Sequence, residues 1–156
     1  AAVRAAGRPQ VTRVYSSDLL SLVRAEAVDV HALSHVTGGG LAANLARVLP
    51  GHLHARLDRS TWTPPAVFST VGALGSVPRE DLERTLNMGV GFVAMVPADD
   101  VDAATDLLAA RGIHAWALGE VHDADGAPLE RGAELVRGAK GVDGGSVQVV
   151  GDHPAP

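Results

Sequence analysis

The chain has 156 residues, enough to bury one continuous core and short of the size at which a second core becomes the default, so we expect one domain. Hydrophobic residues make up 46% and charged residues 20%, as in globular domains, which argues against wholesale disorder. The net charge is −5 and the arginines are scattered among acids, which argues against a nucleic-acid partner, while the lack of cysteine excludes disulfide scaffolds, thiolate zinc sites and cysteine nucleophiles.

The two ends of the sequence differ in character from its middle. Residues 1–11 carry no hydrophobic period and are interpreted as a leader or linker remnant, and the start at Ala1 without methionine suggests a piece of a longer protein. Residues 12–137 are predicted to form the folded domain, and residues 138–156 a tail rich in glycine and proline with one possible short strand. No apolar run approaches the roughly 20 residues that cross a bilayer, so we expect a cytoplasmic protein with no membrane partner.

Helical and strand periods alternate along the middle of the sequence. Apolar residues spaced three and four apart predict helices, and strict alternation or a short apolar run predicts strands. In chain order the predicted elements are a helix from Ser16, a strand over 28–36, a helix over 41–49, a strand over 53–57, a helix after Pro64, a short helix from Pro78 to Leu86, a strand over 90–96, a helix from Asp99 to Arg111, and strands over 113–121, 133–136 and 146–150.

Two of these elements carry further expectations. The strand over 90–96 is mostly apolar and β-branched, which predicts burial on both faces. Asp99, Asp100 and Asp102 fall in the first turn of a helix and Arg111 in its last turn, so we interpret these acids as partners of the helix dipole and assign them no catalysis. Because no unbroken βαβ series is present, the fold class is predicted as α+β, with a single mixed, largely antiparallel sheet packed by helices and partly ferredoxin-like.

The strongest local motif is the run from His35 to Gly40, His-Val-Thr-Gly-Gly-Gly, between a predicted strand and a predicted helix. Successive glycines let main-chain amides turn toward one point, and the helix start adds unpaired amides and a positive dipole end, an arrangement that suits a phosphate. The alternative is a tight turn that needs glycine only for positive φ angles, and the pattern alone leaves both open. No Lys-Ser or Lys-Thr pair follows the glycines, so this is not a Walker loop.

Several further motifs surround this run in collinear order. They are Thr-Arg-Val-Tyr at 12–15, H-x-T-G-G-G-x-x-x-N at 35–44, Arg-Val-Leu-Pro at 47–50, W-x-x-P-x-V-F at 62–68, G-x-V at 75–77 and T-x-N-M-G-V-G at 85–91. Together they resemble the C-terminal domain of aminoimidazole ribonucleotide synthetases, which are phosphoribosylformylglycinamidine cyclo-ligases. The resemblance runs from about Thr12 to Val121, with Leu86 in place of an aromatic and Val11 in place of a proline.

The resemblance implies a two-domain enzyme of purine biosynthesis whose N-terminal domain, absent here, binds most of the ATP and Mg. In such enzymes the formyl amide oxygen of formylglycinamidine ribonucleotide is activated by the γ-phosphate of ATP, and the amidine nitrogen then closes the imidazole ring, releasing phosphate and ADP. We expect this fragment to be inactive alone, with the ribonucleotide and the N-terminal domain as its partners and a homodimer for the full-length protein. No catalytic residue is assigned.

Candidate ligand contacts gather at two glycine-containing segments. Thr37 offers a hydroxyl, Asn44 lies one helical turn further on and could direct its amide at the same anion, and His35 abuts the glycines as a donor or as part of the turn, which the pattern leaves undecided. Arg13 and Arg47 are the candidate cations. The predicted substrate-binding residues are His35, Thr37, Gly38, Gly39, Gly40, Asn44, Asn87 and Gly89, with no metal ligand among them.

Other motifs receive a structural interpretation. The run from Gly89 to Ala94 fits G-x-G-x-x-A, but it leads into a predicted strand instead of opening a helix, which disfavours dinucleotide binding. His52 and His54 share one face of a predicted strand and are expected to face solvent, because two ligands do not make a metal site.

Two other functions stay open at this point. A relative within the same ATP-using superfamily is disfavoured by the matches at 47–50 and 85–91. A stand-alone α+β module that binds small molecules or regulates another protein is the alternative from a different class.

Overall fold

The computed structural model of the protein describes residues 13–125, 129–130, 133–139 and 143–155. The chain divides into two compact units, which we describe separately. Of the described residues, the first unit comprises 13–31 together with 95–116, and the second comprises 32–94 together with those after 116. None of the described helices is long and apolar enough to cross a membrane.

The first unit pairs two helices. In α2 (Ser16–Val23), Leu19 and Leu22 are buried, and in α6 (Val101–Ala110), Ala104 and Leu108 are buried, as expected from helical spacing. Helix α6 follows the 3-10 turn η2 (Ala98–Asp100). An ion pair of 2.8 Å between Arg111 and Asp18 links the end of α6 to the first turn of α2, near the helix ends where charges offset the dipoles.

The described strands form two sheets, which corrects the expectation of a single sheet in partly ferredoxin-like order. The expected α+β class is confirmed. The smaller sheet pairs β1 (Ala32–His35) with β3 (Phe92–Met95). The larger has the order β4-β2-β6-β5, in which β2 and β6 are parallel and the two outer pairs antiparallel, so it is mixed as predicted. Its strands are β4 (Gly119–Asp123), β2 (Leu53–Asp58), β6 (Asp143–Val150) and β5 (Glu134–Ala139).

Strand β6 lies inside the larger sheet although it comes from the segment predicted as a tail. The expected strand over 146–150 is present and begins earlier, at Asp143. Its hydrogen-bonded neighbours are β2 and β5, and the three residues Val147, Val149 and Val150 are buried. Other strands are shorter than predicted: β1 and β3 span four residues each, β3 is half-buried instead of buried on both faces, and β4 begins only at Gly119.

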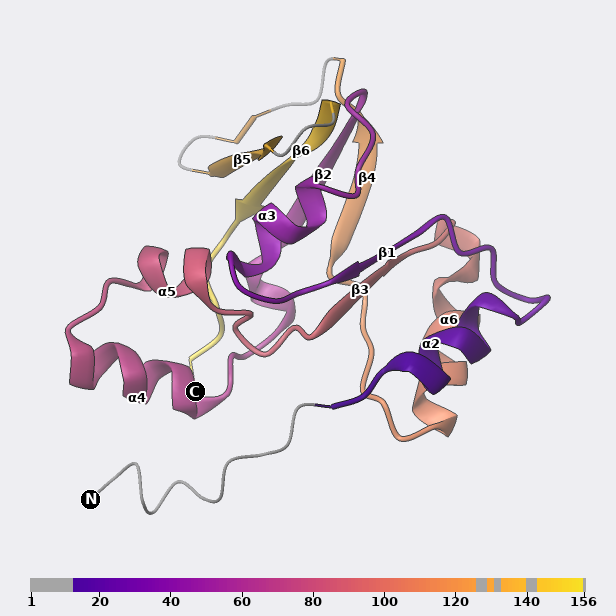
Figure 1. Ribbon diagram of the computed structural model, residues 1–156, viewed down its shortest axis with the longest axis horizontal. Helices are drawn as coiled ribbons and strands as arrows, with labels where there is room; N and C mark the ends of the chain where they lie inside the picture. Colours follow the sequence, from indigo (N-terminus) through magenta and orange to yellow (C-terminus); the bar gives the residue numbers. More distant parts are fainter. Residues whose placement is uncertain (1–12, 126–128, 131–132, 140–142, 156) are drawn as a thin grey trace. The chain divides into compact units, whose positions relative to one another are not determined.

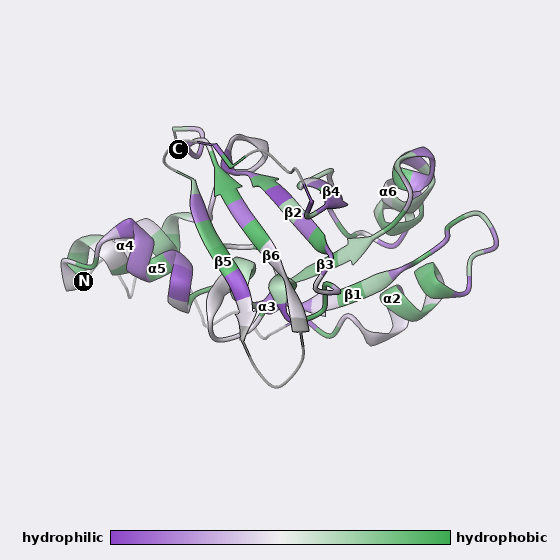
Figure 2. Ribbon diagram, turned by 90° about the horizontal axis from the view of Figure 1, so that it is seen from above, coloured by the Kyte–Doolittle hydropathy of each residue, from purple (hydrophilic) through white to green (hydrophobic). Residues whose placement is uncertain are grey.

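Helix α3 (Gly40–Ala46) covers one face of the larger sheet and also packs on α5 (Arg79–Thr85) (Figure 1). The face toward α3 is apolar, because Ala55 and Leu57 of β2 stand in register with Val147 and Val149 of β6. The alternate positions are polar, and Figure 2 shows the resulting bands along β2, β5 and β6. Before α5 the chain forms the 3-10 turn η1 (Arg59–Thr61) and helix α4 (Ala66–Gly75).

His54 is buried, so the prediction that it faces solvent is wrong, whereas His52 is exposed as expected. The exposed fraction of His54 is 3%, and its Nδ1 lies 2.8 Å from Oγ of Ser146 on β6. Burial, with a smaller contribution from the charge of His122 opposite it on β4, lowers the pKa of His54 below its ordinary value. No local signal in the sequence indicated this burial, because Ser146, the partner of His54, lies 92 positions away in the chain.

This histidine gives a prediction for stability against pH. Below the ordinary pKa of about 6.5 the unfolded chain takes up a proton that folded His54 resists, so the free energy of unfolding falls as the pH falls through that value. The loss levels off below the lowered pKa of the folded state. We expect thermal melts between pH 8 and pH 5 to show this decline in the wild type and a weaker one in His54→Asn, which keeps a group beside Ser146. An equally steep decline in the variant would contradict this assignment.

Candidate functional site

The predicted glycine motif forms a loop, residues 36–40, between β1 and α3. Gly39 occupies the N-cap position of α3 with a φ of 98°, and Gly40 follows with a φ of 75°. Residues with side chains rarely adopt these angles, so the tight turn does require glycine at both positions. The second interpretation of the motif, an anion site, depends on where the amides of the loop point.

Asn44 fixes the direction of those amides. Its Nδ2 donates to the carbonyl oxygens of Thr37 and Gly38, each at 3.3 Å, and of Gly40 at 2.6 Å. In a trans peptide the N–H points opposite to the C=O of the preceding residue. Because the carbonyls of Thr37 and Gly38 point in toward Asn44, the amides of Gly38 and Gly39 point out.

Neither of these two amides donates a backbone hydrogen bond within the described part of the chain, and both residues are exposed. Two adjacent outward amides at a helix start can share one anion. Asn44 itself is 7% exposed, and its amide group donates to carbonyl oxygens of the loop. In this structure it therefore shapes the loop, whereas the sequence suggested that it could direct its amide at the anion.

The three consecutive glycines differ in why they are glycine. A Cβ at Gly40 would collide with the carbonyl oxygen of Glu83 in α5, so this residue is needed for packing. A Cβ at Gly39 would have room, and only its φ restricts it. A Cβ at Gly38 would have no heavy atom within 4 Å, and its φ is not positive, so nothing inside the described structure requires glycine there. The space beside Gly38 is therefore open to a ligand.

Arg47 brings a positive charge to the same corner. Its guanidinium NH2 group donates to Oδ1 of Asn44, and its Nε donates to the carbonyl of Ala43 at 3.0 Å. The same NH2 group would lie 3.8 Å from a Cβ at Gly39. Of the two candidate arginines, Arg47 is thus at the loop, while Arg13 lies in the first unit and pairs weakly with Asp18.

The second predicted segment lies beside the glycine loop. The amide of Val36 donates to the carbonyl of Gly91 at 3.0 Å, which joins the end of β1 to the start of β3. Residues 87–91, the second loop, contain a turn in which Oδ1 of Asn87 accepts from the amide of Gly89 at 3.1 Å. Gly89 has a φ of 94°, and a Cβ there would lie 2.6 Å from Cδ of Pro65. The structure thus brings both predicted segments together.

The remaining predicted contacts are on the exposed side of this corner. His35 is exposed and stacks on Phe92 of β3 with ring centroids 5.3 Å apart, and Thr37 is exposed. Gly91 leads into β3, so the G-x-G-x-x-A run opens a strand, as we expected in disfavouring dinucleotide binding. The described residues contain no group of three or more histidines or acids placed to hold a metal.

Sequence reasoning missed a buried ion pair between η1 and α5. Arg59 of η1 and Glu83 of α5 lie 2.7 Å apart, with side chains 7% and 10% exposed. Neither residue lies within a motif, and the two are 24 positions apart in the sequence. The one local signal was the position of Arg59 directly after a strand with apolar alternation.

Comparisons with known proteins agree with the resemblance seen in the motifs. The family model described as "AIR synthase related protein, C-terminal domain" matches residues 4–130. The "Putative phosphoribosylformylglycinamidine cyclo-ligase" of Streptomyces fradiae is 50% identical over 142 residues, which make up 91% of this chain and 70% of that protein. The "Phosphoribosylformylglycinamidine cyclo-ligase" of Anaeromyxobacter dehalogenans strain 2CP-1 and that of Anaeromyxobacter sp. strain Fw109-5 are each 44% identical over 126 residues, 81% of this chain and 35% of those proteins. The chain thus spans about a third of the length of these two relatives.

Proposed function

The chain belongs to the AIR synthase related family, as its C-terminal domain, and on that premise we propose that it is the phosphate-binding half of a phosphoribosylformylglycinamidine cyclo-ligase. In the full protein the formyl amide oxygen of formylglycinamidine ribonucleotide attacks the γ-phosphate of ATP and ADP leaves. The amidine nitrogen then attacks the activated carbon, and phosphate departs with the oxygen as the imidazole ring forms. The task of this half is to hold the ribonucleotide by its own phosphate.

One observation carries this assignment: the amides of Gly38 and Gly39 point outward with no hydrogen-bond acceptor in the described structure, over open space. A phosphate oxygen supplies the acceptor that both amides lack. Arg47 adds a positive charge behind the loop, and Thr37 is exposed beside it. His35, Asn87 and Gly89 are then placed to meet the sugar or the base precursor, because their segments adjoin the glycine loop.

The other parts of the enzyme are proposed from the family. We assign most contacts to ATP and Mg to an N-terminal domain of the same protein, and we propose that the full-length enzyme is a homodimer in the cytoplasm. Helix α4 supports the need for a covering domain, because none of its residues is buried and Val67, Val71 and Leu74 are 53%, 44% and 67% exposed along one face. Such an apolar face is typical of an interaction surface. A stand-alone regulatory module is not favoured, because the relatives are named as enzymes.

Substitution of Gly38 tests the phosphate site without disturbing the free protein. Gly38→Ala and Gly38→Val add side chains into open space at an ordinary φ, so both variants should melt near the wild-type temperature. Both should bind ribose 5-phosphate more weakly, Val more than Ala, because the added atoms occupy the position of the anion. Loss of both charge-assisted hydrogen bonds predicts a decrease of roughly a hundredfold for Val.

The measurement is an NMR titration of the amide signals of residues 36–40 with ribose 5-phosphate. Thr37→Val is the matched control, since it adds no bulk at Gly38 and removes only a hydroxyl, and it should lose less affinity than Gly38→Val. Wild-type affinity in Gly38→Val would show that the phosphate binds elsewhere.

A further inference from the structure

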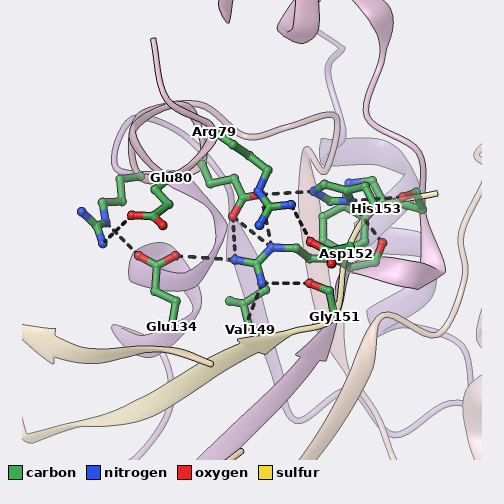
Figure 3. Close-up of polar contacts among 11 residues, drawn as sticks. Arg79, Glu80, Glu134, Val149, Gly151, Asp152 and His153 are labelled. Atoms are coloured by element: carbon green, nitrogen blue, oxygen red, sulfur yellow. Dashed lines mark hydrogen bonds and ion pairs between the residues drawn. The ribbon is translucent and has the colours of Figure 1, made fainter. Parts of the chain in front are cut away.

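The chain after β6 folds back onto the elements that support the candidate site. Residues 151–153, here called the C-terminal segment, follow Val150 and make four polar contacts with η1 and α5 (Figure 3). Asp152 accepts from Arg79 at 2.7 Å, and the carbonyl of Gly151 accepts from Arg59 at 3.4 Å. None of these residues belongs to a motif of the family resemblance.

His153 makes the most contacts in this segment. Its Nδ1 faces the carbonyl oxygens of Arg59 and Trp62 at 3.1 and 3.3 Å, so we assign a proton to Nδ1 as the donor. The ring also meets the ring of Trp62 edge-on, with centroids 4.5 Å apart. Its Nε2 lies 3.3 Å from Oε1 of Glu83, a distance that makes an ion pair when this nitrogen carries a second proton, and it makes no hydrogen bond to any described residue.

Glu83 connects this contact to the glycine loop. Its carboxylate accepts from Nε and NH2 of Arg59 and lies near Arg79, so three basic groups surround one buried carboxylate. The main-chain carbonyl of Glu83 packs against Gly40 so closely that a Cβ at Gly40 would not fit between them. Packed groups with no spare volume transmit displacement, so a shift of Glu83 moves Gly40 and the loop that it ends.

Trp62 connects the same histidine to the second loop. Its Nε1 donates to the carbonyl of Met88 at 3.2 Å, and Met88 holds a φ of 49°, an angle uncommon for a residue with a side chain. The bond from Trp62 therefore helps to hold the second loop in a turn that it would not adopt by preference. His153 contacts both Trp62 and Glu83, and each of these contacts one loop.

We propose that His153 is a positioning residue for the phosphate site, acting through Glu83 on the glycine loop and through Trp62 on the second loop. The expected effect of His153 on loop geometry rests on the contacts alone. Its expected effect on phosphate binding rests in addition on the proposed function. His153 touches no ligand in this arrangement. Its removal takes away the edge-on contact with the ring of Trp62 and one of the three basic groups around the carboxylate of Glu83, so both loops lose part of the support that fixes their relative position.

The first test needs no ligand. Amide chemical shifts and hydrogen exchange are compared between the wild type, His153→Ala and His153→Asn, which keeps a donor near the two carbonyls. We expect the signals of residues 38–40 and 88–91 to shift and exchange faster in the alanine variant, with the asparagine variant in between. Signals from both loops that stay at wild-type values in the alanine variant would overturn the proposal, whatever the phosphate site does.

The second test measures affinity for ribose 5-phosphate by calorimetry. Loss of one hydrogen bond to a charged group weakens binding roughly tenfold, so we expect His153→Ala, in which the loop amides are misaligned, to bind roughly tenfold more weakly. Leu22→Ala is the control, because it removes a buried side chain of the first unit and lowers the melting temperature, whereas both loops belong to the second unit. It should bind as the wild type does.

The two tests separate the two proposals. Wild-type affinity for ribose 5-phosphate in His153→Ala would overturn the positioning role. An equal loss of affinity in Leu22→Ala would overturn it too, because the effect would then come from general destabilisation. If the loops shift as expected but the wild-type protein does not bind ribose 5-phosphate at residues 36–40, the positioning role stands and the phosphate site is wrong.

Discussion

The isolated chain is expected to show no ATP-dependent ring closure, and addition of the separately expressed N-terminal domain is expected to restore it. Phosphoryl transfer depends on bringing ATP and substrate together in one geometry, and we propose that this chain holds the ribonucleotide while the N-terminal domain holds most of the ATP. The measurement is formation of ADP and of aminoimidazole ribonucleotide from formylglycinamidine ribonucleotide, with each half alone and with both mixed. Ring closure by this chain alone at the rate of the mixture would contradict the division of labour.

Helix α4 supplies the matched variants for this mixing experiment. Leu74→Asp places a charge on the exposed apolar face, and because this side chain is 67% exposed the fold should tolerate the change. We expect more N-terminal domain to be needed for half-maximal activity. Ser69→Asp is the control, since it introduces the same charge on the same helix at an exposed polar position. Equal effects of the two variants would show that the apolar face is not where the domains meet.

Breaking the buried pair of Arg59 and Glu83 is expected to give the largest loss of stability, about 3–5 kcal/mol for Glu83→Ala. Removing the carboxylate leaves the buried Arg59 guanidinium beside the Val149 and Gly151 carbonyls, with its charge only partly balanced by the more distant carboxylate of Glu134 at 3.6 Å. It also removes the group between Arg79 and His153. Urea unfolding followed by tryptophan fluorescence measures the change, because Trp62 contacts His153 and reports on this region.

Two controls separate the charge from the packing. Glu80→Gln changes an exposed carboxylate of the same helix, 71% exposed, and should alter the midpoint little because solvent screens its pair with Arg84. The double variant Arg59→Met with Glu83→Leu removes both charges and should recover much of the loss. If Glu83→Ala is no less stable than Glu80→Gln, the pair of Arg59 and Glu83 is not buried in solution.

Local patterns predicted the elements of this fold better than their assembly. Helical spacing located α2, α4 and α6, and the glycine run located the turn before α3, because these signals act within a few residues. Strand pairing joins distant segments, so the two-sheet arrangement and the interior place of β6 left no local signal. The glycine-rich composition of residues 138–145 pointed to a tail, yet Gly138, Gly144 and Gly145 pack closely against main-chain atoms, where side chains would not fit.

The structure brings the two predicted glycine segments side by side, and their binding of a ligand stays a prediction. The sequence placed His35 to Gly40, Asn44 and residues 87–91 together through the family resemblance. It did not predict that Asn44 turns its amide inward, because that direction depends on the φ angles of Gly39 and Gly40. The burial of His54 and the contacts of His153 were missed for a related reason, since each depends on a partner about 90 positions away in the chain.

The most direct measurement is a crystal structure of the two-domain protein with formylglycinamidine ribonucleotide. We predict that phosphate oxygens lie within hydrogen-bond distance, about 2.7–3.2 Å, of the amide nitrogens of Gly38 and Gly39. A phosphate held by other residues, with this loop facing only solvent, would contradict the proposal.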